Sequence, residues 1–232
     1  MAVFNVEVLT AINEWQRGGS HKQKIRRGAA LKEACSSLPS QFRRCGQLCY
    51  RQEAHEKDRV WQLLANEALP ESIAAWTASL SLAKQFKGGV PPNNLQGVIF
   101  VKTPSDDQVI LNLVEVYADS EFREACETHR EAIPGFSLGI GKYGDSQFEI
   151  VLDIEALGTD EVLSYGGFSS TVEDLAALAL GHPPSSDELE LFELTTAKAG
   201  IRPGPWWLSA DGTRRVLDRL APRLAELRAN KK

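Results

Sequence analysis

The beginning of the chain repeats apolar side chains at helical spacing. They occur at every third position, at Val6, Leu9, Ile12 and Trp15. Such a stripe forms one side of a helix. The pattern predicts a helix from about residue 3 to 17, ended by Gly18-Gly19, and a second helix from Ser20 to Ser37.

The middle of the chain carries short runs of β-branched and aromatic residues. Turn-forming clusters such as PPNN, TPSDD and GKYGDS separate these runs. The runs predict strands at residues 98–101, 109–114 and 148–154, preceded by a helix within 55–71 that breaks near Pro70. Short strands joined by loops of varied length favour a compact antiparallel or mixed sheet over repeated βαβ units.

The sequence after Gly158 returns to helical patterns. A capping-box pattern, Ser170-x-x-Glu173, precedes LAALAL, and a second serine-led start precedes LELFELTTAKAG. The last predicted helix covers about 212–230 and contains Pro222, which should end or kink it. Together these elements predict an α+β fold with helices at both ends of a β-rich centre.

Composition indicates one globular unit without a strong electrostatic preference. The chain has 232 residues, 43% of them hydrophobic and 25% charged, and a formal net charge of −5. This balance gives no basic field to hold a nucleic-acid backbone. There is no secretory signal and no long apolar run, so we expect cytoplasmic synthesis and no membrane partner; delivery to a target cell without a cleaved signal stays open.

The cysteines do not predict a metal site. Their positions, 35, 45, 49 and 126, lack the paired spacing of structural zinc sites, so free thiols are expected. Acidic residues between Asp106 and Glu121 are explained by solvated turns and strand edges. We therefore expect no metal.

An acid stands at the head of the strand predicted near residue 150. Glu149 begins an apolar, period-two run. A carboxylate at such a position must be solvated, be paired or have a functional role. Gln147 lies two residues earlier and should face the same side of that strand. Upstream, Tyr50-Arg51 and Thr77-Ala78-Ser79 provide a guanidinium and two hydroxyls.

In this order, the three segments resemble the signature of the mono-ADP-ribosyltransferases: an aromatic-Arg strand, a Ser-Thr-Ser strand and a Glu/Gln-x-Glu strand. The resemblance implies a split β-sandwich that binds NAD as substrate. It also implies a catalytic core at 48–158, with helical segments at 1–47 and 159–232 packed on it as one globular unit.

The resemblance assigns roles to individual residues. Glu149 matches the catalytic glutamate, which stabilises positive charge on the ribose. Arg51 matches the arginine that holds the NAD phosphate, and Thr77 matches the hydroxyl that orients the glutamate. Ser79 and Phe86 belong to the same NAD-binding surroundings.

Two further residues correspond to acceptor recognition. Gln147 as the first residue of Gln-x-Glu accompanies acceptors other than arginine, because an amide can donate to and accept from another amide or a base edge. Tyr143 lies in the loop 139–146, which matches the family's acceptor-facing loop; a flexible Gly-rich hairpin is the alternative. Gln52 after Arg51, and Ala78, depart from the family pattern.

The resemblance therefore predicts transfer of ADP-ribose from NAD to a macromolecular acceptor. The acceptor would be a protein side chain such as Asn or Gln, or a nucleic acid. Bacterial members of this kind act as toxins or effectors, and an antitoxin, immunity protein or chaperone is then an expected partner. The alternatives are an NAD glycohydrolase and a catalytically silent interaction module of the same fold.

Overall fold

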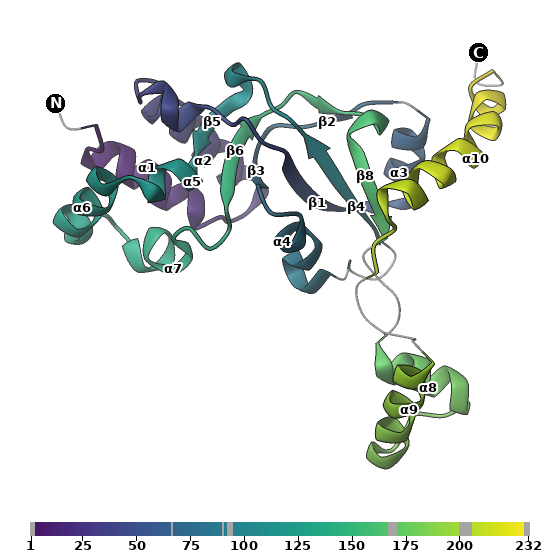
Figure 1. Cartoon of the computed structure of the whole chain (residues 1–232). Coiled ribbons are helices and arrows are strands. Elements are labelled where there is room, and N and C mark those ends of the chain that lie inside the picture. The colour runs from purple at the N-terminus through teal and green to yellow at the C-terminus, as the bar shows by residue number, and fades with distance from the viewer. Residues whose placement is uncertain are drawn as a thin grey trace. The chain divides into compact units, whose positions relative to one another are not determined.

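The protein combines helices and a sheet, which confirms the α+β class. The computed structural model describes residues 3–65, 67–89, 91, 95–166, 171–199 and 206–229 (Figure 1). The chain groups into two compact units that interleave along the sequence. Unit 1 comprises Met1–Arg51, Ala68–Leu82 and Val101–Glu161; unit 2 comprises Gln52–Glu67, Ala83–Phe100 and Val162–Lys232.

The sheet of unit 1 has Tyr50-Arg51, Thr77 and Glu149 on neighbouring strands. Its strand order is β5-β6-β3-β1, and β1 continues into unit 2. The strands are β1 (Cys49–Glu56), β3 (Ile73–Thr77), β5 (Val109–Asn112) and β6 (Glu149–Asp153). A separate antiparallel pair joins β2 (Leu69–Pro70) to β7 (Ala156–Leu157).

Helices and short turns complete unit 1. The α-helices are α1 (Val6–Gln16), α2 (His21–Ala34), α5 (Leu113–Ala118), α6 (Ser120–His129) and α7 (Ile140–Tyr143). The 3₁₀ turns are η1 (Ser40–Arg43), η3 (Asp106–Gln108), η4 (Arg130–Ala132), η5 (Phe136–Leu138) and η6 (Thr159–Glu161). Helix α4 (Leu80–Gln85) follows β3 at the unit boundary.

The core of unit 1 is built on α1 and the sheet. Leu9 and Ile12 are fully buried and belong to one cluster with β5 and β6 residues. The ring of Phe4 makes edge contacts with Phe42 and Phe122, at centroid distances of 5.1 and 5.2 Å. Edge-to-face geometry adds to the stabilisation that burial gives.

The buried face of α1 differs slightly from the predicted stripe. Val6 is 37% exposed, whereas the polar residues Asn13 and Gln16 are buried beside Trp15. Side chains at i, i+3 and i+4 share a helix face, so Asn13 and Gln16 lie on the core side with Leu9 and Ile12. This helix therefore brings hydrogen-bonding groups, as well as apolar ones, into the interior.

Asn13 connects α1 to the segment before β6. Its side-chain oxygen accepts from the Ile140 backbone nitrogen at 3.0 Å, and its Nδ2 donates to the Pro134 carbonyl at 3.0 Å. A Cβ on Gly139 would lie only 2.4 Å from Asn13 oxygen atoms. Glycine is therefore required at 139 for α1 and α7 to approach this closely.

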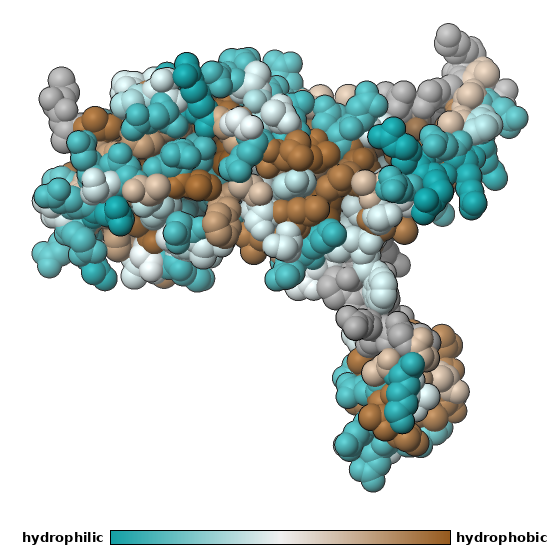
Figure 2. All heavy atoms as spheres, viewed as in Figure 1, coloured by the Kyte–Doolittle hydropathy of each residue, from teal (hydrophilic) through white to brown (hydrophobic). Residues whose placement is uncertain are grey.

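Unit 2 contains the end of β1 and two further strands. Next to β1 lie β4 (Leu95–Lys102) and then β8 (Val162–Gly166), which is antiparallel to β4. The helical elements are α3 (Lys57–Leu64), η2 (Phe86–Gly89), α8 (Val172–Leu180), α9 (Ser186–Lys198) and α10 (Ala210–Ala229). The α8–α9 pair displays leucines on its surface, notably Leu178, Leu191 and Leu194 (Figure 2).

Several predicted elements are corrected. Residues 113–114 belong to α5 instead of a strand, because the Asn112 side chain caps that helix by accepting from Val114 and Glu115 nitrogens. His55 and Glu56 extend β1, so the helix predicted within 55–71 is limited to α3.

The C-terminal third also departs from the predicted pattern, which was largely helical. Residues 162–166 form β8. Pro222 does not end α10, which continues to Ala229. The predicted cap Ser170 lies outside the described residues, and the side chain that caps α8 is Thr171, which accepts from the Asp174 nitrogen. None of the helices in the described ranges is long and apolar enough to cross a membrane.

Candidate functional site

Backbone pairing aligns parts of the three motif segments across unit 1. Glu149 on β6 pairs with Thr77 on β3, and Thr77 pairs with Tyr50 on β1. Residues directly opposite one another in an antiparallel ladder share a face of the sheet. The side chains of Glu149, Thr77 and Tyr50 therefore form a row across three adjacent strands.

Glu149 is buried beneath helix α1. Its side chain is only 6% exposed, and its Oε1 accepts a hydrogen bond from the Trp15 indole Nε1 at 2.6 Å. Burial raises the pKa of Glu149 from 4.5 to about 7, although hydrogen bonds from Trp15 and Gln16 oppose the rise. At neutral pH this carboxyl group is therefore present in both protonation states.

A buried polar network continues from Glu149 into α5 and α7. The Tyr117 hydroxyl donates to Gln16 Oε1 at 2.8 Å, and Gln16 Nε2 donates to the Gly144 carbonyl at 3.3 Å. Burial is the main cause of the raised pKa of Tyr117, so its hydroxyl stays protonated and able to donate. Gln16 therefore links the acid to both neighbouring elements.

Thr77 lies beside Glu149 but uses its hydroxyl differently from the predicted role. Its Oγ1 donates to the Gln147 carbonyl at 2.8 Å and accepts from the Ser79 nitrogen at 3.1 Å. A hydroxyl has a single proton to donate. Here that proton holds the chain at the start of β6, so it does not orient the Glu149 carboxylate.

Gln147 does not share a strand face with Glu149, and that prediction is wrong. Strand β6 begins at Glu149, and Phe148 between the two has a positive φ of 45°. The alternation of side chains requires extended backbone, which a left-handed residue interrupts. Phe148 is 49% exposed. It is an aromatic residue next to the site that the sequence motif did not indicate.

Arg51 is not brought to the Glu149 carboxylate. It follows Tyr50 on β1, so alternation directs its side chain to the opposite face from the Glu149 row. Its guanidinium donates to the Ala75 carbonyl at 3.2 Å and forms an ion pair with Glu71 at 3.5 Å. The guanidinium is thus directed toward the beginning of β3, whereas Glu149 pairs with the end of that strand.

Two other predicted residues have local roles in the structure. Ser79 lies beyond the end of β3; its Oγ is 3.0 Å from Ser81 Oγ and accepts from the Leu82 nitrogen at 3.3 Å, at the start of α4. Tyr143 ends α7 and is half-buried, with Lys142 Nζ 4.9 Å from its ring centroid. Residues 140–143 of the predicted loop 139–146 therefore form a short helix.

Phe86 belongs to the other unit. It is half-buried and opens η2 in unit 2, whereas Glu149, Thr77 and Arg51 belong to unit 1.

The two residues that contact Glu149, Trp15 and Gln16, were not predicted as part of the site. Trp15 matched the apolar stripe of a helix, and such a stripe reports burial without indicating a partner. The only sequence signal for these contacts was the position of Glu149 in an apolar strand, because a buried carboxylate requires a hydrogen-bond donor. That requirement does not identify which of the chain's donors meets it.

The cysteines are free, and two of them lie close together. Cys45 Sγ and Cys49 Sγ are 3.5 Å apart, and both residues are buried. The hydrogen bond between the thiols lowers the pKa of Cys45 and raises that of Cys49. Within the described ranges, no three His, Cys, Asp or Glu side chains are grouped so that they could hold a metal ion.

Comparisons with protein-family models, curated proteins and solved structures give no match for this chain.

Proposed function

We propose that this chain is an NAD-dependent mono-ADP-ribosyltransferase that acts on a macromolecular acceptor. The observation that carries the proposal is the row formed by β6, β3 and β1, in which Glu149 is paired with Thr77 and Thr77 with Tyr50. One residue from each of the three motif segments lies in this row, on adjacent strands. A carboxylate in this row is the group that ribose chemistry needs.

The proposal specifies what Glu149 must do. Its ionised form would accept a hydrogen bond from a ribose hydroxyl and stabilise positive charge as the nicotinamide leaves. A pKa of about 7 leaves a substantial ionised fraction at neutral pH. NAD binding requires the Trp15 indole to give up its bond to Glu149. Arg51 lies on the opposite face of the sheet from this row, so phosphate binding by Arg51 requires a change in the register of β1 as well as loss of its contacts with Ala75 and Glu71.

The acceptor and the biological role follow from the motif. Gln147 favours an acceptor other than arginine, such as an amide side chain or a nucleobase, and the role would be that of a toxin or effector. With water as the acceptor, the same residues would make the protein an NAD glycohydrolase. The identity of the product separates these two activities.

A second candidate is a catalytically silent interaction module. Two observations favour it: Glu149 is covered by Trp15, and the Arg51 guanidinium is engaged by Glu71. A silent protein would retain this arrangement permanently. A transferase must open it when NAD binds.

The test is incubation of the full chain with NAD labelled in the adenylate phosphate, in the presence of cell lysate. Label on protein or nucleic acid supports transfer, whereas label released only as free ADP-ribose indicates a glycohydrolase. Glu149→Gln should abolish either activity. Glu155→Gln, a matched change at an exposed acid, should preserve it. Intact NAD with the folded wild-type chain would refute the enzyme proposal and leave the silent module.

A further inference from the structure

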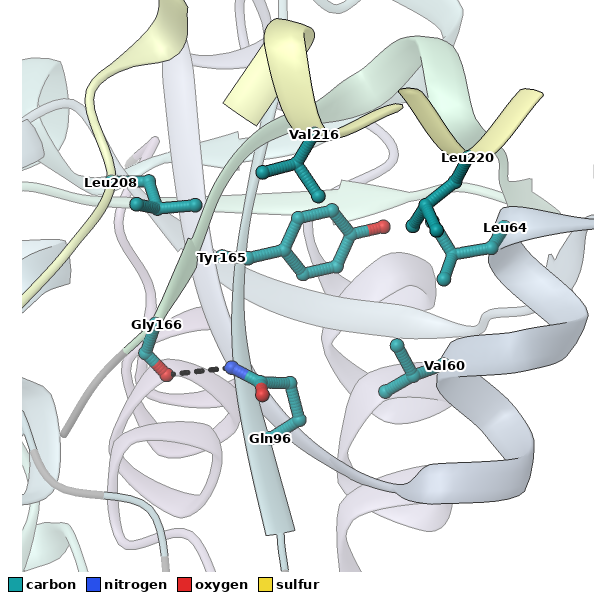
Figure 3. A pocket seen from close by; sticks show the side chains of 8 residues that line it. All are labelled: Val60, Leu64, Gln96, Tyr165, Gly166, Leu208, Val216 and Leu220. Carbon is teal, nitrogen blue, oxygen red and sulfur yellow. Dashed lines mark hydrogen bonds between the residues drawn. The ribbon is translucent and has the colours of Figure 1, made fainter. Parts of the chain in front are cut away.

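Unit 2 has an apolar hollow, but the residues that line it offer no reactive group. The hollow lies among α3, β4, β8 and α10, and its lining is mainly aliphatic (Figure 3). Its amide, Gln96, already donates to the Gly166 carbonyl at 3.1 Å, and the Tyr165 hydroxyl is buried. A reactive pair outside the proposed transferase site lies in unit 1 instead, where Cys45 and Cys49 meet.

The two thiols are already in contact in the reduced protein. The Sγ atoms of Cys45 and Cys49 are 3.5 Å apart. The Gln47 carbonyl lies 3.6 Å from the first sulfur and 3.8 Å from the second. Formation of a disulfide requires the sulfur atoms to approach by only about 1.5 Å more. A small local shift is therefore enough to join them.

The chain between the two cysteines can make this shift. Residues 44–48 form no helix or strand, and the three residues between the cysteines are exposed. A Cβ on Gly46 would meet no atom within 4 Å, so the segment is not packed against a neighbour there. At its ends, the Arg44 carbonyl accepts from Asn112 Nδ2 at 2.8 Å, and Cys49 begins β1. The ends of the segment are thus held, while its middle is free to adjust.

Cys45 is the thiol that should react first. It is 6% exposed, whereas Cys49 is fully buried. The hydrogen bond with Cys49 lowers the pKa of Cys45 to about 6, although burial and the charge of Glu115 oppose the change. At neutral pH, Cys45 is therefore largely a thiolate, which is the nucleophilic form. Cys126 has the same exposed fraction, but burial raises its pKa to about 11, so it remains a thiol.

We propose that Cys45 and Cys49 form a reversible oxidation site, which a peroxide converts into an intramolecular disulfide and a dithiol reductant restores. The Cys45 thiolate attacks a peroxide oxygen and the O–O bond breaks, which gives a sulfenic acid and hydroxide. The proton that Cys45 released neutralises this hydroxide. The Cys49 sulfur then attacks the Cys45 sulfur, the S–O bond breaks, and the departing hydroxide takes the Cys49 proton to become water. The two sulfurs together lose two electrons, and the peroxide gains them.

Peptide mapping tests the site directly in the full chain. Trypsin cleavage after Arg44 and Arg51 releases residues 45–51, which contain both members of the pair, and places the other two cysteines in separate peptides. The reduced protein is treated with equimolar hydrogen peroxide at pH 7, alkylated, digested and analysed by mass spectrometry. The peptide of residues 45–51 should lose two hydrogen atoms and escape alkylation, and dithiothreitol should reverse both changes. Cys126 should be oxidised at least about tenfold more slowly, because so little of it is thiolate.

Three variants separate the roles of the thiols. Cys49→Ser removes the sulfur that closes the disulfide, so Cys45 should remain a sulfenic acid that dimedone traps. Cys45→Ser should leave Cys49 reduced. Cys126→Ser, a change at an equally exposed cysteine, should form the disulfide as the wild type does. Circular dichroism verifies that each variant is folded.

The result for the wild-type chain decides the proposal even if a variant does not fold. The proposal is overturned if the peptide of residues 45–51 stays fully alkylated after peroxide treatment, or if it is cross-linked to another cysteine peptide. It is also overturned if Cys126 is oxidised as fast as Cys45.

Discussion

Replacement of Glu149 by glutamine tests the electrostatic description of the site without assuming any function. The buried carboxyl group has a pKa raised from 4.5 to about 7. A group with a higher pKa in the folded state binds protons more tightly there than in the unfolded chain. Stability therefore falls as pH rises from about 4.5 to about 7, and the loss is complete above that range.

The size of this effect follows from the same values. Each unit of pKa difference corresponds to 1.36 kcal/mol, so ionisation of Glu149 destabilises the folded state by about 3 kcal/mol above pH 7. Glutamine keeps the shape of the protonated acid, and its oxygen can still accept from Trp15 Nε1. Glu149→Gln should therefore gain about 3 kcal/mol relative to the wild type between pH 4.5 and pH 7.5.

The assay is hydrogen exchange of the β6 amides at a series of pH values, which reports the opening of unit 1 separately from that of unit 2. Glu155→Gln provides the control and should follow the wild-type profile. If Glu149→Gln and the wild type have parallel profiles, the carboxyl group is not buried as described. The raised pKa would then be wrong, together with the role of Trp15.

Three other changes test the surroundings of the acid. Trp15→Phe removes the donor to Glu149 and should destabilise unit 1 by about 1.5–3 kcal/mol at pH 8. The loss should be smaller at pH 5, where the acid is protonated, and urea unfolding at both pH values measures the difference. Leu9→Ala should destabilise by about 2–5 kcal/mol in urea, whereas Leu138→Ala, at an exposed site, should change stability by less than about 0.5 kcal/mol. Thr77→Val removes the hydrogen bond to the start of β6 and should destabilise by about 1–3 kcal/mol, with faster exchange of the β6 amides; Thr77→Ser should restore most of the loss.

The sequence predicted the elements whose signals are local. Helix α1 has its cap at Asn5, whose side chain accepts from the Val8 nitrogen, and α9 has the expected capping box between Ser185 and Glu188. These contacts join residues three apart, so they are readable from the order of residues. Asn112 was a readable signal of the same kind within the run 109–114, but the β-branched and aliphatic residues around it favoured a strand.

The site was harder to predict, because it depends on contacts between distant residues. The sequence placed Glu149 on a strand correctly, and the structure pairs it with Thr77. It did not reveal the positive φ of Phe148, which a bulky residue rarely adopts and which takes Gln147 out of the strand pattern. Nor did it reveal the register that pairs Tyr50, instead of Arg51, with Thr77. A shift of one residue reverses the face of every side chain in a strand.

The cover over Glu149 decides between an active enzyme and a silent module, and its strength follows from the contacts. Opening it exposes an indole whose burial contributes about 4–6 kcal/mol. Above pH 7, opening also releases the ionised carboxylate, whose burial costs about 3 kcal/mol with the Trp15 hydrogen bond included. The net free energy of opening is about 1–3 kcal/mol, so roughly one molecule in five to one in two hundred is open.

An enzyme whose site is mostly covered binds NAD more weakly than its open form, by a factor equal to the ratio of closed to open molecules. Trp15→Ala removes the cover and should strengthen NAD binding by about five- to hundredfold at pH 8, as measured by calorimetry. Trp15→Phe, which keeps most of the indole's bulk, should have a much smaller effect. If NAD binds neither Trp15→Ala nor the wild type while both remain folded, the row of Glu149, Thr77 and Tyr50 is not an NAD site, and the silent module is the better description of this chain.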